Sequence, residues 1–597
     1  MSRTDGSAAI GDYGLLSDGR SLALVAADGA VDWWGMPRLD SVPVLDRLLD
    51  PTDGGYFRLA PEGGHQLSRR YLPGTNVLEL TFSAAEGEAR VLLALNTGAG
   101  HDLPWVELAC RVEAVRGTLP LHWELQGGTG LGAGEPWLEL RGEVPLLSLG
   151  ESSLAVIQPA GGDLQLFAHG ATGRLIARPG RVQAMGLVGS LGQPLWIPAP
   201  EDLLGRLERT VSDWRRWSSQ LGEVGEWTGA VHRSALTLRA LLISAQGAIA
   251  AAGTTSLPER IGGDKNWDYR FSWIRDSSFA LDSMIGLGLH EEVQGAVQWL
   301  LRALRSNGPE PRILYTLEGL AADDVESEAD VPGYRESRPV RLGNGAASQQ
   351  QLGIYGDLFD TVHRYVDAGH LLDRGTGQLL ESLADRCCDF WKRRDSGLWE
   401  LDDLQHYTIS KMGCCVALDR AARLARAGQL PDRGLQRWEA EARAVRERVL
   451  ANCWSEAKGS YTFYAGTEKL DAAVLLAART GFDRGPRLRS TITAVQRELC
   501  DGAFVYRYSG MQEEEGAFVA CGFWVAEALA RSGQVEAGRE QMRSALQMGN
   551  DLGLFAEQVD AGSGVLLGNF PQALSHLSLI NTAHVLEGRP SAGSSGG

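Results

Sequence analysis

The stretch SLPERIGGDKNWDYRFSWIRDSSF, from Ser256 to Phe279, is the part of the chain around which the rest is organised. Its ten residues from Trp267 to Asp276 include four aromatic and four charged side chains. A buried strand cannot hold so many charges unless they are paired, and a solvated loop has no need of so many rings. The mixture favours a polar pocket with aromatic walls, which suits a sugar. Arg275 and Asp276 supply a donor fork beside an acceptor, although a buried ion pair tying a loop to a helix start is an equally good interpretation.

Upstream of this stretch, residues 10–198 carry the pattern of β-strands. Apolar side chains recur at every second position in Val106, Leu108, Cys110 and Val112, as expected of a half-buried strand. Residues 78–82 repeat this alternation, and Gly and Pro residues punctuate the region at short intervals. We therefore predict an antiparallel β-sandwich over residues 1–198.

A single helix is expected between this domain and the next. Leu203, Leu207, Val211 and Trp214 fall on one helical stripe, and acidic residues occupy the first turn. We predict a linker helix within residues 199–225; the alternative is that it is the first helix of the following domain.

From about residue 226 onward the hydrophobic period becomes that of helices. We expect about eleven or twelve helices, most of them separated by long loops. Helices 229–251 and 517–531 are apolar nearly all round, which predicts that they are buried on both sides. A toroid with an inner ring of helices inside an outer ring accounts for this over residues 226–589, and its long loops would carry a site. The Gly/Ser-rich tail 590–597 is expected to be disordered. The helical segments are expected at 229–251, 277–287, 293–304, 352–366, 377–393, 411–427, 438–449, 470–479, 517–531, 534–548 and 573–587.

The composition excludes several classes of partner. The chain has 597 residues and a net charge of −18, and no block of Lys and Arg offers a footprint for nucleic acid or an anionic membrane. It has neither an apolar signal region nor an apolar run long enough to span a bilayer. Its eight cysteines show neither a CxxC pair nor zinc-ligand spacing. We therefore expect a cytoplasmic protein without a metal or other cofactor, and an oligomer is left open.

Three further loops contain candidate functional residues, and each has a structural alternative. Glu400 follows Trp399, and an apolar wall would raise its pKa and keep a proton on it for donation; alternatively it is a first-turn acid favoured by a helix dipole. Glu557 lies among apolar residues and could activate a water, or it could cap a helix or pair with an Arg. The segment 343–350 is rich in amides that bind hydroxyls, or it is an N-terminal cap.

The combination of these loops is more specific than each loop alone. Two carboxylates in separate loops, together with a pocket of Trp, Tyr, Arg and Asp, match the needs of glycoside hydrolysis. One carboxylic acid protonates the leaving oxygen, and the other carboxylate acts as a base or a nucleophile.

At this point the chain resembles glycoside hydrolase family 15, the bacterial glucoamylase and trehalase-like group. Residues 263–276 (GDKNWDYRFSWIRD) resemble the first site loop of that family, and residues 10–16 with 28–33 resemble its opening β domain. Trp399-Glu400 resembles the segment of the general acid, and residues 556–558 (AEQ) that of the general base. Residues 568–576 (GNFPQALSH) are similar to the segment that follows. These motifs occur in family order over nearly the full length.

The resemblance implies an N-terminal β-sandwich followed by an (α/α)6 barrel, and hydrolysis with inversion at the anomeric carbon. By the same resemblance, Glu400 is the general acid and Glu557 the general base. The chain differs from the family's pattern in two segments: residues 401–404, which follow the acid, and residues 512–518, which resemble the family's GEEGTF segment but lack its leading Gly. These differences affect the expected linkage preference rather than the reaction class. The candidate substrate-binding residues are Tyr269, Trp273, Arg275, Asp276, Trp399, His406 and Glu515.

The first hypothesis for the activity is an inverting, exo-acting α-glucosidase of the glucoamylase type. It would release β-glucose from the non-reducing end of short gluco-oligosaccharides, and an α,α-trehalase is the alternative within this class. A disaccharide phosphorylase is a second hypothesis, but a carboxylate at the water position would repel phosphate, so Glu557 favours hydrolysis. A non-catalytic sugar-binding protein is the third, and it predicts loss of one acid, whereas both are present.

Overall fold

Two eight-stranded antiparallel sheets occupy the N-terminal part of the computed structural model, which describes residues 3–98, 103–159, 163–243, 247–308, 310–322 and 326–588. The tail predicted at 590–597 lies outside these ranges. The first sheet has the order β1 (Gly14–Ser17), β2 (Leu22–Val25), β3 (Ala30–Gly35), β5 (Tyr56–Pro61), β10 (Leu119–Gln126), β15 (Gly170–Ala177) and β14 (Leu164–Phe167), with β4 (Pro43–Leu45) paired to β3. The second has the order β11 (Trp137–Arg141), β12 (Val144–Leu149), β13 (Ser152–Ile157), β16 (Val182–Leu191), β9 (Val106–Gly117), β8 (Gly87–Leu95), β7 (Leu78–Ser83) and β6 (Gln66–Tyr71).

The alternation seen in the sequence sets which face of each strand is buried. In β10 every second residue, starting from Leu119, is buried, and the residues between are half exposed. In β9 the register places Cys110 between Leu93 of β8 and Met185 of β16. Side chains from both sheets meet in one apolar core, so the predicted antiparallel β domain is confirmed.

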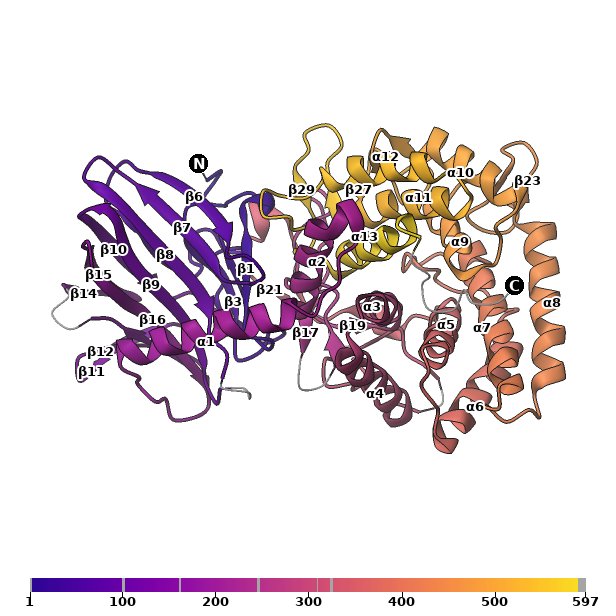
Figure 1. Cartoon of the computed structure of the whole chain (residues 1–597), viewed down its shortest axis with the longest axis horizontal. Helices are drawn as coiled ribbons and strands as arrows, with labels where there is room; N and C mark the ends of the chain where they lie inside the picture. Colours follow the sequence, from indigo (N-terminus) through magenta and orange to yellow (C-terminus); the bar gives the residue numbers. More distant parts are fainter. Residues whose placement is uncertain are drawn as a thin grey trace.

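Helix α1 (Pro200–Ser218) lies along the second sheet and connects the two parts of the chain (Figure 1). Leu203, Leu207 and Trp214 pack in a small cluster with residues of β9 and β16. The buried Arg206 donates to Glu107 of β9 at 2.9 Å, which attaches the helix to the sheet. At its other end, Trp217 of the helix donates to Glu292 of α4 (His290–Ser306) at 2.7 Å, so the helix contacts both parts of the chain.

Six inner helices surrounded by six outer ones form the rest of the described chain. Each inner helix contacts the next and the last contacts the first, so the ring closes, as expected of an (α/α)6 barrel. The inner helices are α3 (Ile274–Leu287), α5 (Ile354–Asp367), α7 (Thr408–Arg426), α9 (Leu476–Thr480), α11 (Val519–Arg531) and α13 (Ala573–Leu586). The outer helices are α2 (Thr228–Leu241), α4 (His290–Ser306), α6 (Arg374–Phe390), α8 (Leu435–Asn452), α10 (Pro486–Leu499) and α12 (Val535–Leu546).

Three expectations about helices were wrong. Helix α2 ends at Leu241 rather than at 251, because Leu242 takes an extended conformation and β17 (Leu242–Ile243) pairs with β18 (Ala248–Ile249). The expectation that this helix is buried on both sides is confirmed, because α2, an outer helix, packs between α13 and the β domain. Helix α10 was missed, and the predicted segment 470–479 is a 3-10 turn, η5 (Ala472–Leu475), followed by the short α9.

The loops that precede the inner helices all lie at the same end of the barrel. The stretch 256–273 precedes α3, and the loops before α5, α7, α11 and α13 contain the other predicted site segments. The β domain supports this end directly, because Trp33 donates to the carbonyl of Gly253 at 3.2 Å and Arg270 donates to the carbonyl of Ser41 at 3.0 Å.

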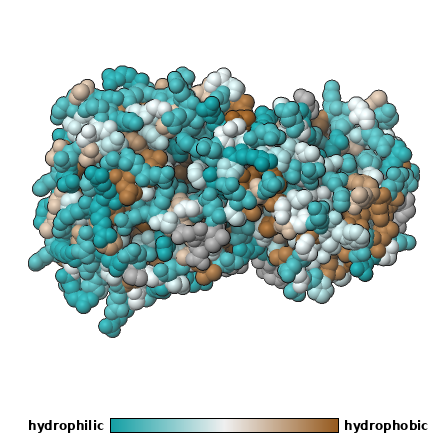
Figure 2. Space-filling view, turned by 180° about the vertical axis from the view of Figure 1, so that it is seen from behind, coloured by the Kyte–Doolittle hydropathy of each residue, from teal (hydrophilic) through white to brown (hydrophobic). Residues whose placement is uncertain are grey.

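The outer surface is mostly hydrophilic on the face shown in Figure 2, with hydrophobic side chains scattered or gathered in small areas. Over the described ranges no helix has the length and apolar character needed to span a membrane.

Candidate active site

A cavity of about 430 Å3 opens at the loop end of the barrel. Five of the loops that precede inner helices contribute to its walls. Inner helices α3, α11 and α13 begin at residues of this wall, so the positive ends of their dipoles face the cavity. Aromatic rings and charged groups both line it: Trp267, Tyr269, Trp273, Arg275, Asp276, Trp399, Glu400, Phe518, Glu259, Lys265 and Arg507.

Glu400 faces this cavity in the loop before α7. Its Oε1 accepts a hydrogen bond from Trp273 Nε1 at 2.8 Å and lies 3.8 Å from Arg275 Nη1. Burial raises the pKa of Glu400 above its usual range, although Arg275 and the Trp273 donor oppose the shift. A carboxyl group with a raised pKa that still reaches the cavity is suited to donating a proton. Helix α7 begins only at Thr408, so Glu400 is not a first-turn acid.

The backbone at Glu400 is held in a left-handed conformation, with φ of 62°. Such a conformation is unfavourable for a residue with a side chain and persists where neighbouring contacts fix it. Here Arg275 donates to the carbonyl of Leu398 at 3.0 Å, and Gln349 donates to the carbonyl of Glu400 at 3.1 Å. Trp399 is anchored by a 2.8 Å hydrogen bond from its indole nitrogen to Asp471. The loop is therefore clamped on both sides of the acid.

Glu557 is almost completely enclosed, with 1% of its surface exposed. It is held next to β28 (Gln558–Val559), which pairs with β27 (Ala517–Phe518) in front of α11. Its Oε2 accepts from the backbone nitrogen of Asn569 at 3.3 Å. Burial, followed by the nearby Glu259 carboxylate, raises the pKa of Glu557 to about 8, while Tyr269 and Arg507 act in the other direction.

Tyr269 connects the surroundings of the two acids. Its ring meets that of Trp273 edge to face with centroids 5.4 Å apart, and Trp273 donates to Glu400. Burial raises the pKa of Tyr269, and the charges of Glu557, Glu259 and Glu400 raise it further. Tyr269 is thus within electrostatic reach of both acids. Glu557 itself stands behind the cavity wall to which Tyr269 and Phe518 contribute.

Arg275 and Asp276 stand together at the first turn of α3. Arg275 Nε lies 3.2 Å from Asp276 Oδ2, and both residues line the cavity. Both interpretations of the pair are therefore compatible with its position, since the pair begins a helix and also presents a donor fork and an acceptor to the cavity.

The remaining predicted residues lie at different distances from the cavity. Trp399 lines it, and its ring packs edge to face against Phe518 with centroids 5.3 Å apart. Glu515 lies behind the wall, where it is bonded to Arg507. His406 is not brought to the cavity; it is half-buried, and Lys411, Arg448 and Arg394 are close enough to lower its pKa along with burial.

Several residues at the cavity were not singled out in the sequence. They are the charged Glu259, Lys265 and Arg507, the aromatic Trp267 and the amide Gln349. Glu259, Lys265 and Trp267 belong to the opening stretch, but nothing in the pattern separates a buried Glu from a solvated one. Gln349 belongs to the amide-rich segment 343–350, in which Asn344 also caps a 3-10 turn by accepting a 2.9 Å hydrogen bond from the backbone nitrogen of Ala346.

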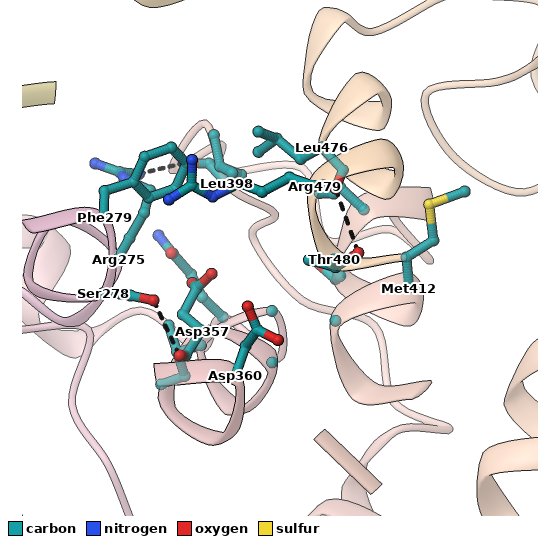
Figure 3. Close-up of a pocket in the computed structure, with 17 residues that line it drawn as sticks. Arg275, Ser278, Phe279, Asp357, Asp360, Leu398, Met412, Leu476, Arg479 and Thr480 are labelled. Atoms are coloured by element: carbon teal, nitrogen blue, oxygen red, sulfur yellow. Dashed lines mark hydrogen bonds between the residues drawn. The ribbon is translucent and has the colours of Figure 1, made fainter. Parts of the chain in front are cut away.

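A second, smaller cavity of about 60 Å3 lies among the inner helices of the barrel (Figure 3). Arg275 and Leu398 line both cavities and so form the partition between them. Asp357 and Asp360 of α5 face this inner space (Figure 3), and burial raises the pKa of Asp357 to about 7. Arg275 therefore has a third carboxyl group nearby, in addition to those of Asp276 and Glu400.

The described residues contain no group of three or more His, Cys, Asp or Glu side chains that could hold a metal ion. The expectation that the protein needs no cofactor stays a prediction.

Comparison with known proteins identifies the family. Residues 227–548 match "Glycosyl hydrolases family 15", and residues 3–88 match "Trehalase-like, N-terminal". The chain is 34% identical to the trehalase of Mycolicibacterium smegmatis, over 98% of this chain and 92% of that protein. It is 29% identical to the trehalase of Thermoplasma volcanium, over 96% and 93% of the two chains.

Among solved structures, a bacterial glucoamylase in complex with acarbose superimposes with a TM-score of 0.74. It covers 98% of this chain and 95% of its own, at 13% sequence identity, which supports a shared fold only. The family match covers more than half of the chain, and the match to the mycobacterial relative covers nearly all of it. The chain therefore belongs to glycoside hydrolase family 15 and is a glycoside hydrolase.

Proposed function

We propose that this glycoside hydrolase is an α,α-trehalase that acts with inversion. The observation that carries the proposal is the similarity of nearly the whole chain, β domain included, to proteins named trehalase. The cavity volume of about 430 Å3 falls in the range of small-molecule sites and suits a disaccharide. The glucoamylase-type reading rests on a structural likeness at 13% identity, and that likeness supports the fold rather than the substrate.

In the proposed reaction Glu400 donates its proton to the oxygen between the two glucose rings. The bond from that oxygen to one anomeric carbon breaks, and a water attacks the same carbon from the opposite face. Glu557 takes the proton that the water loses. The products are one β-glucose and one α-glucose, and the protein then returns a proton from Glu557 to Glu400 through solvent.

Substrate recognition is assigned to the residues around Glu400. Arg275 and Asp276 would bind hydroxyls of the glucose ring whose bond is cleaved, because a guanidinium only donates and a carboxylate only accepts. Tyr269, Trp273 and Trp399 would contact the C–H faces of the rings. Inversion requires room for a water between the base and the sugar, which predicts a separation of roughly 6.5–9.5 Å between the two carboxyl groups in the complex.

The test is a panel of disaccharides followed by NMR. Trehalose, maltose, isomaltose, nigerose and kojibiose are supplied separately, with and without phosphate, and the first product anomers are recorded. We expect hydrolysis of trehalose to equal amounts of α- and β-glucose. Cleavage of maltose or isomaltose with no action on trehalose would replace the proposal by a glucoamylase-type activity, and glucose 1-phosphate as product would indicate a phosphorylase.

The domain limits also remain proposals: a β domain over 1–198, a linker helix over 199–225 and a catalytic barrel over 226–589. A cytoplasmic location is proposed as well, and it is supported by the eight cysteines, all of which are free thiols.

A further inference from the structure

Glu557 belongs to a cluster of three buried carboxylates and two cations. Arg507 Nη2 lies 2.8 Å from Glu259 Oε2, and Arg507 also bonds Glu515. Lys265 Nζ lies 3.2 Å from Glu515 Oε2. Glu259, Glu515 and Glu557 are each less than 7% exposed. With three negative and two positive groups, this cluster has one carboxylate more than its cations can neutralise.

The chain fold brings Glu259 close to Glu557. The backbone nitrogen of Gly568 donates to the carbonyl of Pro258 at 2.8 Å, one residue before Glu259. The same Gly568 packs on the Glu557 carboxylate so closely that an added Cβ would stand 2.5 Å from its Oε2. The side chain of Gln558, next to Glu557, lies close enough to Glu259 to favour its ionised form.

The cations are distributed unequally among the three acids. Burial works against ionisation of Glu515, but Arg507 and Lys265 hold its pKa below the usual range. Glu259 and Glu557 both have raised pKa values, mainly because of burial, even though Arg507 also faces them. Two neighbouring carboxyl groups that compete for part of one cation are expected to share a proton and to titrate as a pair.

We propose that Glu259 is a positioning residue that shares a proton with Glu557 and so sets the pH range in which Glu557 can act as the base. When the proton lies on Glu259, Glu557 is ionised and can accept a proton from water. When it lies on Glu557, the base is blocked. The groups that face the pair are Tyr269, Asn569 and Arg507 on the side of Glu557, and Arg507, Lys265, Glu515 and Gln558 on the side of Glu259. This inference rests on the proposed role of Glu557.

The first test compares pH profiles of kcat/KM for the substrate that the disaccharide panel identifies. Glu259→Gln removes the second proton site, so the acidic limb should move to lower pH by on the order of one unit. Glu259→Asp keeps the carboxyl group and should keep the limb near its wild-type position. Glu514→Gln, the matched control, removes the same charge from the exposed neighbour of Glu515 and should leave the profile unchanged. If Glu259→Gln lowers kcat/KM by the same factor at every pH and leaves the acidic limb in place, the proposal is overturned.

The second test needs no substrate, so it separates failure of this inference from failure of the proposed function. Infrared difference spectra across a pH titration detect protonated buried carboxyl groups through their C=O stretch. We expect a band that titrates near neutral pH and whose midpoint falls by on the order of one pH unit in both Glu259→Gln and Glu557→Gln, because the remaining carboxyl group then titrates alone. A separate band from Glu400 should disappear only in Glu400→Gln. A midpoint that stays at its wild-type position in Glu259→Gln would refute the shared proton, whatever the enzyme hydrolyses.

Discussion

At the scale of single residues, the two acids differ in how the protein holds them. The Glu400 side chain keeps 20% of its surface exposed and receives a hydrogen bond from an indole ring, whereas Glu557 is enclosed and receives one from a backbone nitrogen. A group that must give a proton to the substrate needs contact with the cavity. A group that acts through a water can stand further back.

Replacing Glu400 by Gln tests the assignment of the acid. The amide is nearly isosteric but has no proton to donate, so kcat should fall by about 10²–10⁴ with a disaccharide. With α-glucosyl fluoride, whose leaving group needs no protonation, the loss should be small. Steady-state kinetics on both substrates decide the matter, and an equal loss on both would remove Glu400 from the role of acid.

Because the raised pKa of Glu400 keeps it protonated, wild-type activity should decline as the pH rises through that pKa.

Gly568 is the second residue on which a substitution is informative. It has φ of 71°, and an added Cβ would meet the Glu557 carboxylate. Gly568→Ala should therefore displace the base and lower kcat by roughly tenfold or more, since small misplacements of reacting groups are costly.

The control for this substitution lies four residues earlier, in the turn that precedes β29 (Leu566–Leu567). Gly564 has φ of 73° but no neighbour within 4 Å of an added Cβ, so Gly564→Ala carries the same backbone cost without the steric one. If the two alanine variants have the same kcat, the close approach of Gly568 to Glu557 is not what the activity needs.

At the scale of helices, a network of ion pairs inside the ring joins α3, α5, α9 and α11. Asp282 of α3 pairs with Arg364 of α5 at 3.0 Å and with Arg479 of α9 at 2.6 Å. Arg479 also lies 3.4 Å from Glu527 of α11. Since each buried charge has a partner, the network fixes how the inner helices pack around the inner cavity.

Removing one member of this network should destabilise the whole barrel. Asp282→Ala leaves two guanidinium groups without that partner and should cost about 3–5 kcal/mol of the free energy of unfolding. Glu540→Ala on α12 breaks an exposed pair with Arg543 and should change stability little. Denaturant unfolding of both variants measures the difference, and similar midpoints would show that the buried network contributes no more than a surface pair.

Helix α13 adds a dependence of stability on pH. His576 is fully buried, accepts from the backbone nitrogen of Phe555 at 3.2 Å and contacts Ser234 at 2.9 Å. Burial, with Arg233 nearby, lowers its pKa to about 3. The unfolded chain binds a proton at this His below about pH 6.5 and the folded chain does not, so stability is lost as the pH falls from that value toward 3.

Unfolding temperatures between pH 7 and pH 4 test this contribution. Wild type should lose stability on acidification, and His576→Gln should start from a lower value but lose less. The half-exposed His232 provides the control, since His232→Gln should keep the wild-type slope. A wild-type slope that persists in His576→Gln would assign the acid sensitivity to other groups.

Whether a helix could be predicted depended on the length of its apolar stripe and on how many of its residues favour a helix. Helix α4 follows the stripe of Val293, Val297, Leu300 and Leu304, all of them buried. Helix α10 carries Leu488, Ile492, Val495 and Leu499 at helical spacing, but its β-branched residues weaken the helical signal. A helix was predicted at 470–479, but the boundary between η5 and the short α9 could not be predicted, because each holds little more than one helical period.

At the scale of the whole molecule, the site is assembled from segments that are far apart in the sequence. The motifs of Glu400 and Glu557 could be recognised one by one, and the resemblance to a family joined them. The ion pairs of Arg507 with Glu259 and Glu515 could not be predicted, because a buried charge looks like a solvated one until the fold supplies its partner. Their place behind Glu557 depends on three loops that meet only in the closed ring.

The β domain takes part in building this site, so the barrel should not function without it. Trp33 holds Gly253 at the entrance to the site stretch, and Arg270 within the stretch is held by Ser41. Asn76 donates to the carbonyl of Leu236 on α2 at 2.8 Å. Without these partners, buried carbonyl groups and the apolar side of α2 would face water.

A fragment that begins at residue 226 should therefore lose at least 10²-fold in kcat/KM and tend to aggregate, because the loop carrying Tyr269, Trp273 and Arg275 loses its support. Addition of separately produced residues 1–225 should restore part of the activity if the two pieces rebuild the contact. Trp33→Phe in the full chain removes one hydrogen bond but keeps an aromatic ring, so this variant should retain most of the activity. It serves as the control that distinguishes the loss of the whole interface from the loss of this one bond. Activity assays and light scattering on the three samples decide the question. A fragment that is monomeric and as active as the full chain would mean that the β domain is not needed to shape the site.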